Sequence, residues 1–177
     1  MPASVRLADG AHEFGPLAAP AAPADWTDLE VDLHWVDLAE RSVARVPLAP
    51  GVVGRGGVSA RLAVYANVHP DGDFANLVDV DPASPTFREV VARIPLEKLT
   101  DGPVAGLPTA GRQARHSAIT ADGARAFVSH GGDGFISVID TAAGAVVARI
   151  ETPTALRGGG YLIAPTLGAP LLELSGR

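Results

Sequence analysis

The feature that most constrains the fold of this 177-residue chain is an internal repeat. Three segments share one pattern: an apolar run ends in aspartate, a short polar turn follows, and a second run reads Val-Ala-Arg and then Val or Ile. These segments cover residues 31–48, 75–96 and 134–153. Repetition on this scale is typical of architectures in which each unit buries its apolar faces against its neighbours.

The spacing of the repeated aspartates indicates the size of the unit. Asp37 and Asp81 lie 44 residues apart, and Asp81 and Asp140 lie 59 apart. The first distance fits a four-stranded sheet of ~40–45 residues that recurs around an axis. The second fits the same period with an insertion, which we assign to the Gly/Pro-rich residues 97–112.

The local pattern predicts strands throughout. Apolar and β-branched runs of four to eight residues recur without a helical period. Turn signals such as Asp122-Gly123 separate many of them. An aspartate that ends a strand is expected to accept hydrogen bonds from the amides of the next turn. The expected strands are residues 29–38, 43–48, 58–67, 75–81, 89–95, 115–120, 125–130, 135–140, 145–150, 159–164 and 171–174.

One run, HSAITADGARAFVSHGGDGFISVIDTAAGAVVARI over residues 116–150, resembles a complete repeat of the YVTN β-propeller family, whose blades are WD40-like. Residues 126–130 stand where that family has Ala-Tyr-Val-Thr-Asn, with His130 at the Asn position, and residues 137–141 match Ser-Val-Ile-Asp-Thr. Residues 58–96 resemble a degenerate second copy. The resemblance implies four-stranded antiparallel blades, but no particular function, because propellers host many.

We therefore expect an all-β chain that forms a partial β-propeller of four-stranded antiparallel blades. Two blades would be complete and two would be half-blades. Residues 1–25 are expected to be a flexible Pro/Ala-rich segment and residues 26–177 to be the propeller. The expected blade repeats are residues 29–48, 51–96, 113–150 and 158–175.

The number of blades raises the question of assembly. Closed propellers have ~4–8 blades, so the chain is expected to belong to a longer protein, to share a ring with a second chain, or to remain an open arc. If it is full-length, two chains could form a homodimer in which each N-terminal half-blade pairs with the C-terminal half-blade of the other.

Composition excludes some functions and leaves the compartment open. The net charge is −6, with 14 basic and 20 acidic residues, which argues against a nucleic-acid partner. The chain has no cysteine, so it can hold no disulfide or thiolate-bound metal.

No apolar run reaches transmembrane length, and the first residues lack the pattern of a signal peptide. We expect a cytoplasmic chain as given, or an exported one if it derives from a longer precursor. Abundant Ala, Gly and Pro, with one Lys among the 14 basic residues, favour a high-GC bacterial source.

A candidate ligand site lies at one end of the best repeat. His116 opens an innermost strand and His130 ends the next, so a hairpin at Asp122-Gly123 would bring both to the same end. With Arg115 and Asp133 they could form a small polar ligand site, or supply two ligands to copper or zinc. The alternative is a purely structural role. Two histidines without a third ligand make a poor metal site, so the metal remains unknown.

No catalytic arrangement is recognisable. The nucleophile elbow and the nucleotide-binding glycine motifs are absent, and no cofactor is predicted. Asp71-Gly72-Asp73 lacks the other ligands of a calcium loop and is interpreted as a tight turn. The sequence favours a binding or interaction scaffold for a protein or small molecule. The alternative is part of a propeller enzyme or an oxidoreductase-like metal protein that uses His116 and His130.

Overall fold

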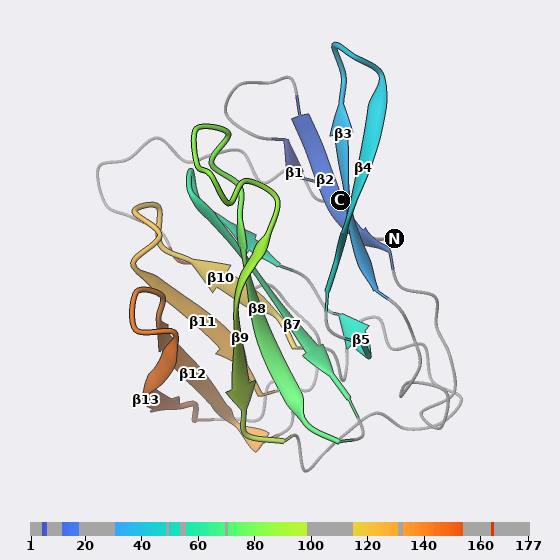
Figure 1. The fold of residues 1–177 in the computed structure, drawn as a ribbon. Helices are drawn as coiled ribbons and strands as arrows, with labels where there is room; N and C mark the ends of the chain where they lie inside the picture. The colour runs from blue at the N-terminus through green and yellow to red at the C-terminus, as the bar shows by residue number, and fades with distance from the viewer. Residues whose placement is uncertain are drawn as a thin grey trace.

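The residues that the structure describes form three antiparallel sheets, two of four strands and one of five, which we call blades 1, 2 and 3 in chain order (Figure 1). The computed structural model describes residues 5–6, 12–17, 31–48, 50–53, 56–69, 71–98, 115–130, 133–153 and 164. Within these residues there are strands and turns but no α-helix, and hence no helix with the length and hydropathy to cross a membrane. Of the predicted strands at residues 159–164 and 171–174, only Ala164 lies within the described residues, and it is not part of a strand.

Blade 1 is complete within one chain. Its strands are β1 (Val5–Arg6), β2 (His12–Leu17), β3 (Asp32–Asp37) and β4 (Ser42–Pro47). This differs from the expectation of a flexible segment over residues 1–25 and a half-blade over residues 29–48, because β1 and β2 supply the two inner strands. β2 was not predicted from the sequence because it contains Gly15 and Pro16, which are unfavourable within strands. The short β1 pairs only with Glu13 and Phe14, so Pro16 needs no ladder hydrogen bond on that side.

Blade 2 has a divided innermost strand. Its members are β5 (Val52–Val53), β6 (Gly57–Val58), β7 (Leu62–Val68), β8 (Asp73–Asp79) and β9 (Val90–Leu96), and both β5 and β6 pair with β7. The single strand expected over residues 58–67 is therefore two strands. Ser59 makes the turn between them, because its Oγ accepts hydrogen bonds from the amides of Arg61 and Leu62.

Blade 3 matches the strands expected from the resemblance. It consists of β10 (Ser117–Ile119), β11 (Arg125–Ser129), β12 (Phe135–Asp140) and β13 (Ala145–Glu151). Gly123 and Gly144, which complete two of its turns, have φ of 74° and 62°, values that glycine adopts without strain.

The aspartate at the end of each third strand caps the turn that follows, which confirms that prediction. Asp37 Oδ1 accepts hydrogen bonds from the amides of Ala39 and Glu40, and Asp140 Oδ1 does so from Ala142 and Ala143. In blade 2 the register corrects the alignment, because Asp79, not Asp81, ends β8.

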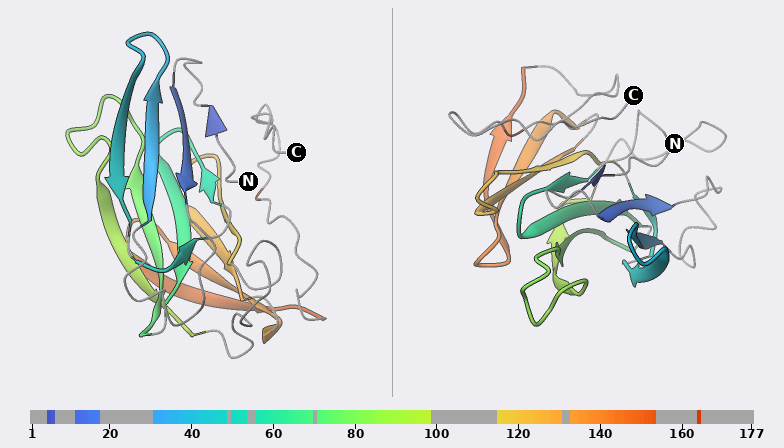
Figure 2. Two further views of the ribbon diagram at one scale, coloured as in Figure 1. Left: turned by 90° about the vertical axis from the view of Figure 1, so that its right-hand side faces the viewer. Right: turned by 90° about the horizontal axis from the view of Figure 1, so that it is seen from above.

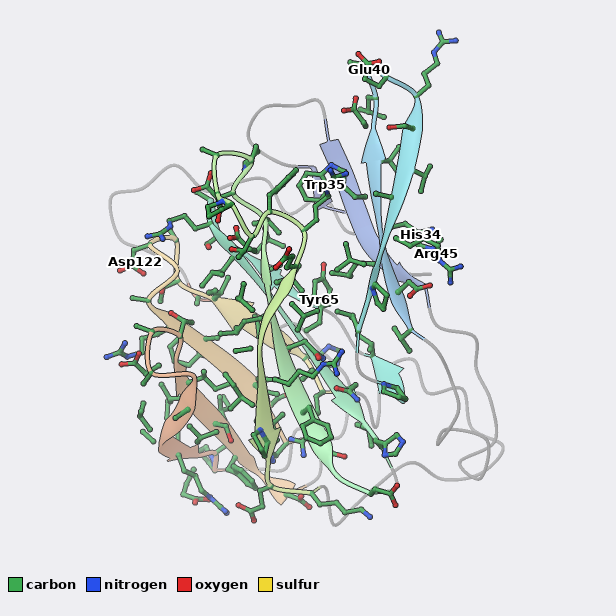
Figure 3. The ribbon with its side chains drawn as sticks, in the orientation of Figure 1. His34, Trp35, Glu40, Arg45, Tyr65 and Asp122 are labelled. Carbon is green, nitrogen blue, oxygen red and sulfur yellow. The ribbon has the colours of Figure 1, made fainter. Side chains whose placement is uncertain are left out.

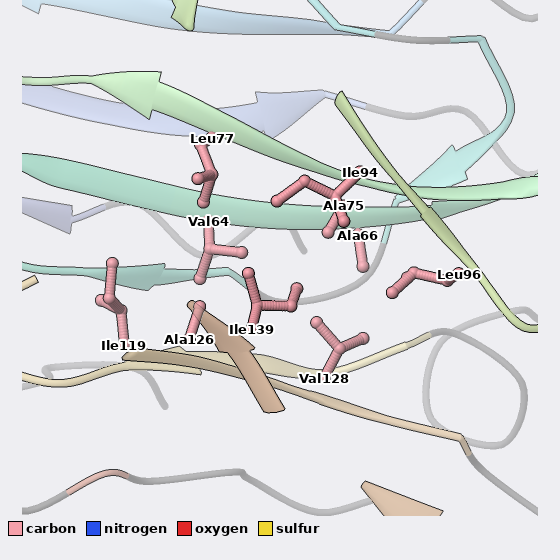
Figure 4. Close-up of a cluster of buried hydrophobic side chains, with 10 residues drawn as sticks. All are labelled: Val64, Ala66, Ala75, Leu77, Ile94, Leu96, Ile119, Ala126, Val128 and Ile139. Atoms are coloured by element: carbon pink, nitrogen blue, oxygen red, sulfur yellow. The ribbon is translucent and has the colours of Figure 1, made fainter. Parts of the chain in front are cut away.

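Side chains alternate between the two faces of a strand, so the strands of blade 2 contribute apolar residues to the interfaces with both neighbouring blades. Ala63 and Tyr65 of β7 join a buried cluster with blade 1, to which Leu33 and Trp35 contribute. The intervening Val64 and Ala66 join a second cluster with blade 3 (Figure 4). Blade 2 thus lies between the other two blades, as the view from above shows (Figure 2). Because both faces of a middle sheet are buried, its strands are apolar nearly throughout.

Candidate functional site

The predicted site residues lie at one end of blades 2 and 3. Arg115 and His116 directly precede β10, and His130 directly follows β11. The amide of Ser129 donates to the carbonyl of His116, so the two histidines are at the same end of the hairpin, as predicted. This end is opposite the turns that carry Glu40 and Asp122 (Figure 3).

Arg115 joins blade 3 to blade 2. Its Nε and Nη2 donate hydrogen bonds to Asp73 Oδ2 at 2.9 and 2.6 Å, and Nη2 also donates to the carbonyl of Glu97. Arg115 is 0% and Asp73 1% exposed. Burial lowers the pKa of the guanidinium, and the Asp73 carboxylate opposes that effect. Since a buried charge needs a partner and hydrogen bonds, the pair makes each residue depend on the other.

His130 is held in one tautomer by this arginine. Its Nδ1 lies 2.8 Å from Arg115 Nη1, and its Nε2 lies 2.7 Å from Ser137 Oγ. A guanidinium can only donate, so Nδ1 accepts and the proton of the neutral ring is on Nε2, which donates to Ser137. Burial, with the nearby Arg115 charge, lowers the pKa of His130 to about 3.

This geometry excludes a serine nucleophile at Ser137. A histidine that activates serine must accept the hydroxyl proton at one nitrogen and donate from the other to a carboxylate. In this cluster Arg115 occupies the accepting nitrogen, so the tautomer is reversed. A ring whose pKa is about 3 is also too weak a base near neutral pH.

The ring of His130 also packs against an aromatic ring of blade 3. It stacks on Phe135 with 3.7 Å between ring centroids and 25° between planes. On Phe135 lies the Arg149 guanidinium, 3.5 Å from the ring centroid. Arg149 in turn pairs with Glu151 on its own strand and with Glu97 after β9, at 3.2 Å. A second, exposed contact between blades 2 and 3 therefore lies beside the buried one.

Blade 2 repeats the polar pair of blade 3. Asn67 corresponds by strand register to His130, and Asn76 to Ser137. Asn76 Nδ2 donates to Asn67 Oδ1 at 3.2 Å, in place of the contact between His130 and Ser137. The position at the end of the second strand therefore holds a buried polar side chain in both blades. This recurrence is evidence for a structural role of the pair.

The other two predicted residues surround this cluster. The amide of His116 donates to Ser129 Oγ at 3.0 Å, and the amide of Asp133 donates to the carbonyl of His130 at 2.8 Å. The charge of Asp133 favours protonation of both Arg115 and His130. Within the described residues, no group of three or more His, Cys, Asp or Glu side chains could hold a metal ion.

Sequence reasoning missed Asp73. The run Asp71-Gly72-Asp73 was interpreted as a tight turn, and Gly72 does lie in a turn. Asp73 nevertheless begins β8, and its Oδ1 accepts a hydrogen bond from the His69 amide at 3.1 Å. Local sequence held no sign of its partner, because Arg115 is 42 residues away.

Comparison with known proteins supports the fold. No protein-family profile and no curated protein matches the sequence. Among solved structures, Kuenenia stuttgartiensis hydrazine synthase matches with a TM-score of 0.56 and 17% identity, over 86% of this chain and 36% of that chain. TolB from Acinetobacter baumannii matches with a TM-score of 0.49 and 15% identity, over 88% of this chain and 33% of that chain.

Both neighbours are β-propeller proteins, and the likeness to hydrazine synthase supports the fold alone. The three stacked antiparallel sheets and this likeness define the chain as a partial β-propeller. The chain spans about a third of each of these larger chains.

Proposed function

We propose that this propeller segment is an interaction scaffold that binds a protein or small molecule at the end of blades 2 and 3 that carries Arg115 and His130. The observation that carries the proposal is the buried cluster of Asp73, Arg115 and His130. A buried ion pair requires both charges to lose their hydration, and apolar packing at the same place is often at least as stable. Such a cluster is useful where strand ends must be held in one arrangement.

The cluster fixes the strand ends that support this surface. Arg115 binds the carbonyl of Glu97, so it joins the two ends of the insertion between β9 and β10. Its partner Asp73 accepts from the amide of His69, which holds the turn between β7 and β8. The exposed charges at this end include Asp71 and Glu97, with side chains 83% and 62% exposed. A rigid base with exposed charged side chains suits recognition better than catalysis.

The predicted site residues have different roles in this proposal. They are Arg115, His116, His130 and Asp133. Arg115 and His130 are fully buried and would position the surrounding turns without touching the ligand. Asp133 is only partly buried, and we propose it as a contact residue together with Asp71 and Lys98. No catalytic step is assigned to any of them.

Pull-down experiments with matched variants test this function. One variant carries Asp71→Ala and Lys98→Ala at the proposed surface. The control carries Glu40→Ala and Arg41→Ala, which also removes one acidic and one basic side chain, from the exposed turn between β3 and β4 at the opposite end. A partner retained by the wild type and the control, but lost from the first variant, is the expected result. A partner retained equally by all three proteins would place the binding surface elsewhere.

A further inference from the structure

Blade 3 has an apolar face that turns away from blade 2. Residues paired across antiparallel strands share one face of a sheet. Phe127 pairs with Val138, and Ile136 pairs with Ile150. Their neighbours along the strands, Ala126 and Ile139 among them, point the other way into the cluster shared with blade 2. We call Phe127, Ile136, Val138 and Ile150 the outer face of blade 3.

The same positions in blade 2 form a blade-to-blade interface. By register, the outer-face residues correspond to Val64, Ala75, Leu77 and Ile94. In blade 2 these four are 0%, 0%, 1% and 2% exposed, because blade 3 packs on them. In blade 3, Ile150 is 46% exposed and the other three are half-buried. Blade 3 therefore presents the surface that blade 2 uses to bind its neighbour.

Blade 1 presents the complementary kind of face. Trp35 points toward blade 2, whereas His34 and Arg45 lie on the opposite side (Figure 3). Beside them Val36 pairs with Val43, which is 61% exposed. By register Val36 and Val43 correspond to Ile139 and Val146. Ile139 belongs to the cluster that blade 3 shares with blade 2, and Val146 is its cross-strand partner. We call His34, Val36, Val43 and Arg45 the free face of blade 1.

We propose that the outer face of blade 3 binds the free face of blade 1 of a second copy of this chain. The two faces repeat the two sides of the interface observed between blades 2 and 3, so they would stack in the same manner. Within the described part of the chain the two faces do not meet, because blade 2 lies between them and the three described blades are fewer than the ~4–8 of closed propellers. Two chains joined twice in this way make a two-fold ring of six blades.

This assembly differs from the exchange of half-blades expected from sequence. Since β1 and β2 pair beside β3 and β4 within one chain, blade 1 needs no strand from the second copy. The association is by stacking of faces, with side chains buried and no new ladder. It is also independent of the ligand surface proposed above, which lies at the strand ends.

Light scattering on the full chain tests the proposal, with substitutions in the outer face. The wild type is expected to have the mass of a dimer. Ile150→Lys places a charge in the stacked face, and we expect it to weaken dimerisation by at least about tenfold. The control is Val147→Lys. Val147 is 52% exposed on the same strand but sits at the bulge of β13, without a cross-strand partner in the register. A cooperatively melting wild-type monomer, or equal loss of the dimer in both variants, would overturn the proposal.

Cross-linking provides a second measurement that does not depend on a destabilising charge. The chain has no cysteine, so Val36→Cys and Val138→Cys each create one reactive site. A short bis-maleimide should join the two variants when they are mixed and should join neither variant to itself. Replacing Val138→Cys by Val147→Cys should abolish the product. Self-linked dimers of either single variant, or no product in the mixture, would contradict head-to-tail stacking.

Discussion

Arg115 Nη1 lies 2.8 Å from His130 Nδ1, and this contact sets the protonation of the whole buried cluster. The guanidinium has only donors, so it holds the imidazole neutral with its proton toward Ser137. A pair that resembles a serine and its general base is thereby converted into a structural hydrogen bond. The arginine itself stays charged beside Asp73, which belongs to the neighbouring blade.

The first prediction concerns that ion pair. Arg115→Met leaves the Asp73 carboxylate buried without its partner, so the free energy of unfolding should fall by about 3–5 kcal/mol. The double variant Asp73→Leu/Arg115→Met should recover most of this loss, because no unpaired charge remains. Urea denaturation measures all three proteins.

A matched control for the ion pair is Arg125→Met, which removes an exposed pair with Asp140 at 3.0 Å. Its effect should be far smaller, since exposed pairs contribute little. If the double variant were no more stable than Arg115→Met, the pairing between Asp73 and Arg115 would not explain the cost.

Stability should depend on pH through His130. The unfolded chain binds a proton there near pH 6.5, whereas the folded chain does so only near pH 3. Unfolding takes up a proton across this range, so the stabilising effect is complete above pH 6.5 and is lost as the pH falls toward 3. The slope is at most ~1.4 kcal/mol per pH unit.

The residue at the equivalent position of blade 2 supplies the control for this pH dependence. His130→Asn places there the side chain found at Asn67, and it cannot titrate. Denaturation between pH 7 and 5 should show a flatter dependence for the variant than for the wild type. Identical slopes would mean that His130 is protonated to the same extent in both states.

Two aspartates of blade 2 should differ in their effect on stability. Asp79 Oδ2 accepts from the hydroxyls of Ser84 and Thr86 at 2.5 and 2.6 Å, and its Oδ1 accepts from the Asp81 amide. Burial would raise the pKa of Asp79, but these hydrogen bonds hold it below its usual value. Asp79→Ala should cost about 2–3 kcal/mol of unfolding free energy.

Asp81 should matter less, because its side chain caps only the Ala83 amide, at 2.9 Å. We expect Asp81→Ala to cost about 1 kcal/mol in the same denaturation experiment. The reverse order would restore Asp81 as the repeat anchor that the sequence alignment had suggested.

Gly57 lies where the backbones of blades 2 and 3 approach each other closely. A Cβ at this position would lie 2.6 Å from the Ala118 Cα and 2.8 Å from the Ala118 carbonyl carbon. Gly57→Ala should therefore lower the free energy of unfolding by about 1–3 kcal/mol. Because the clash is with backbone atoms, adding Ala118→Gly should not restore stability. Rescue by that second change would show that the Ala118 methyl group causes the conflict.

Much of the fold could be predicted from the sequence because the relevant interactions are local. The strand around Ser137 and the turn after Asp140 are encoded within a few residues, by alternation and by an aspartate that caps adjacent amides. The site was predicted in part for the same reason. A hairpin fixes which residues share an end, so His116 and His130 could be brought together without tertiary information.

The sequence by itself determined the repeat, the all-β class and the end of the blades at which Arg115 and His130 lie. Only the tertiary structure decided that Arg115 pairs with Asp73, that β2 completes blade 1, and that Asp79 is the equivalent of Asp140. Each depends on contacts between segments far apart in the chain, through blade packing or strand register. A partner 42 residues away leaves no local pattern, because its position follows from how two whole sheets stack.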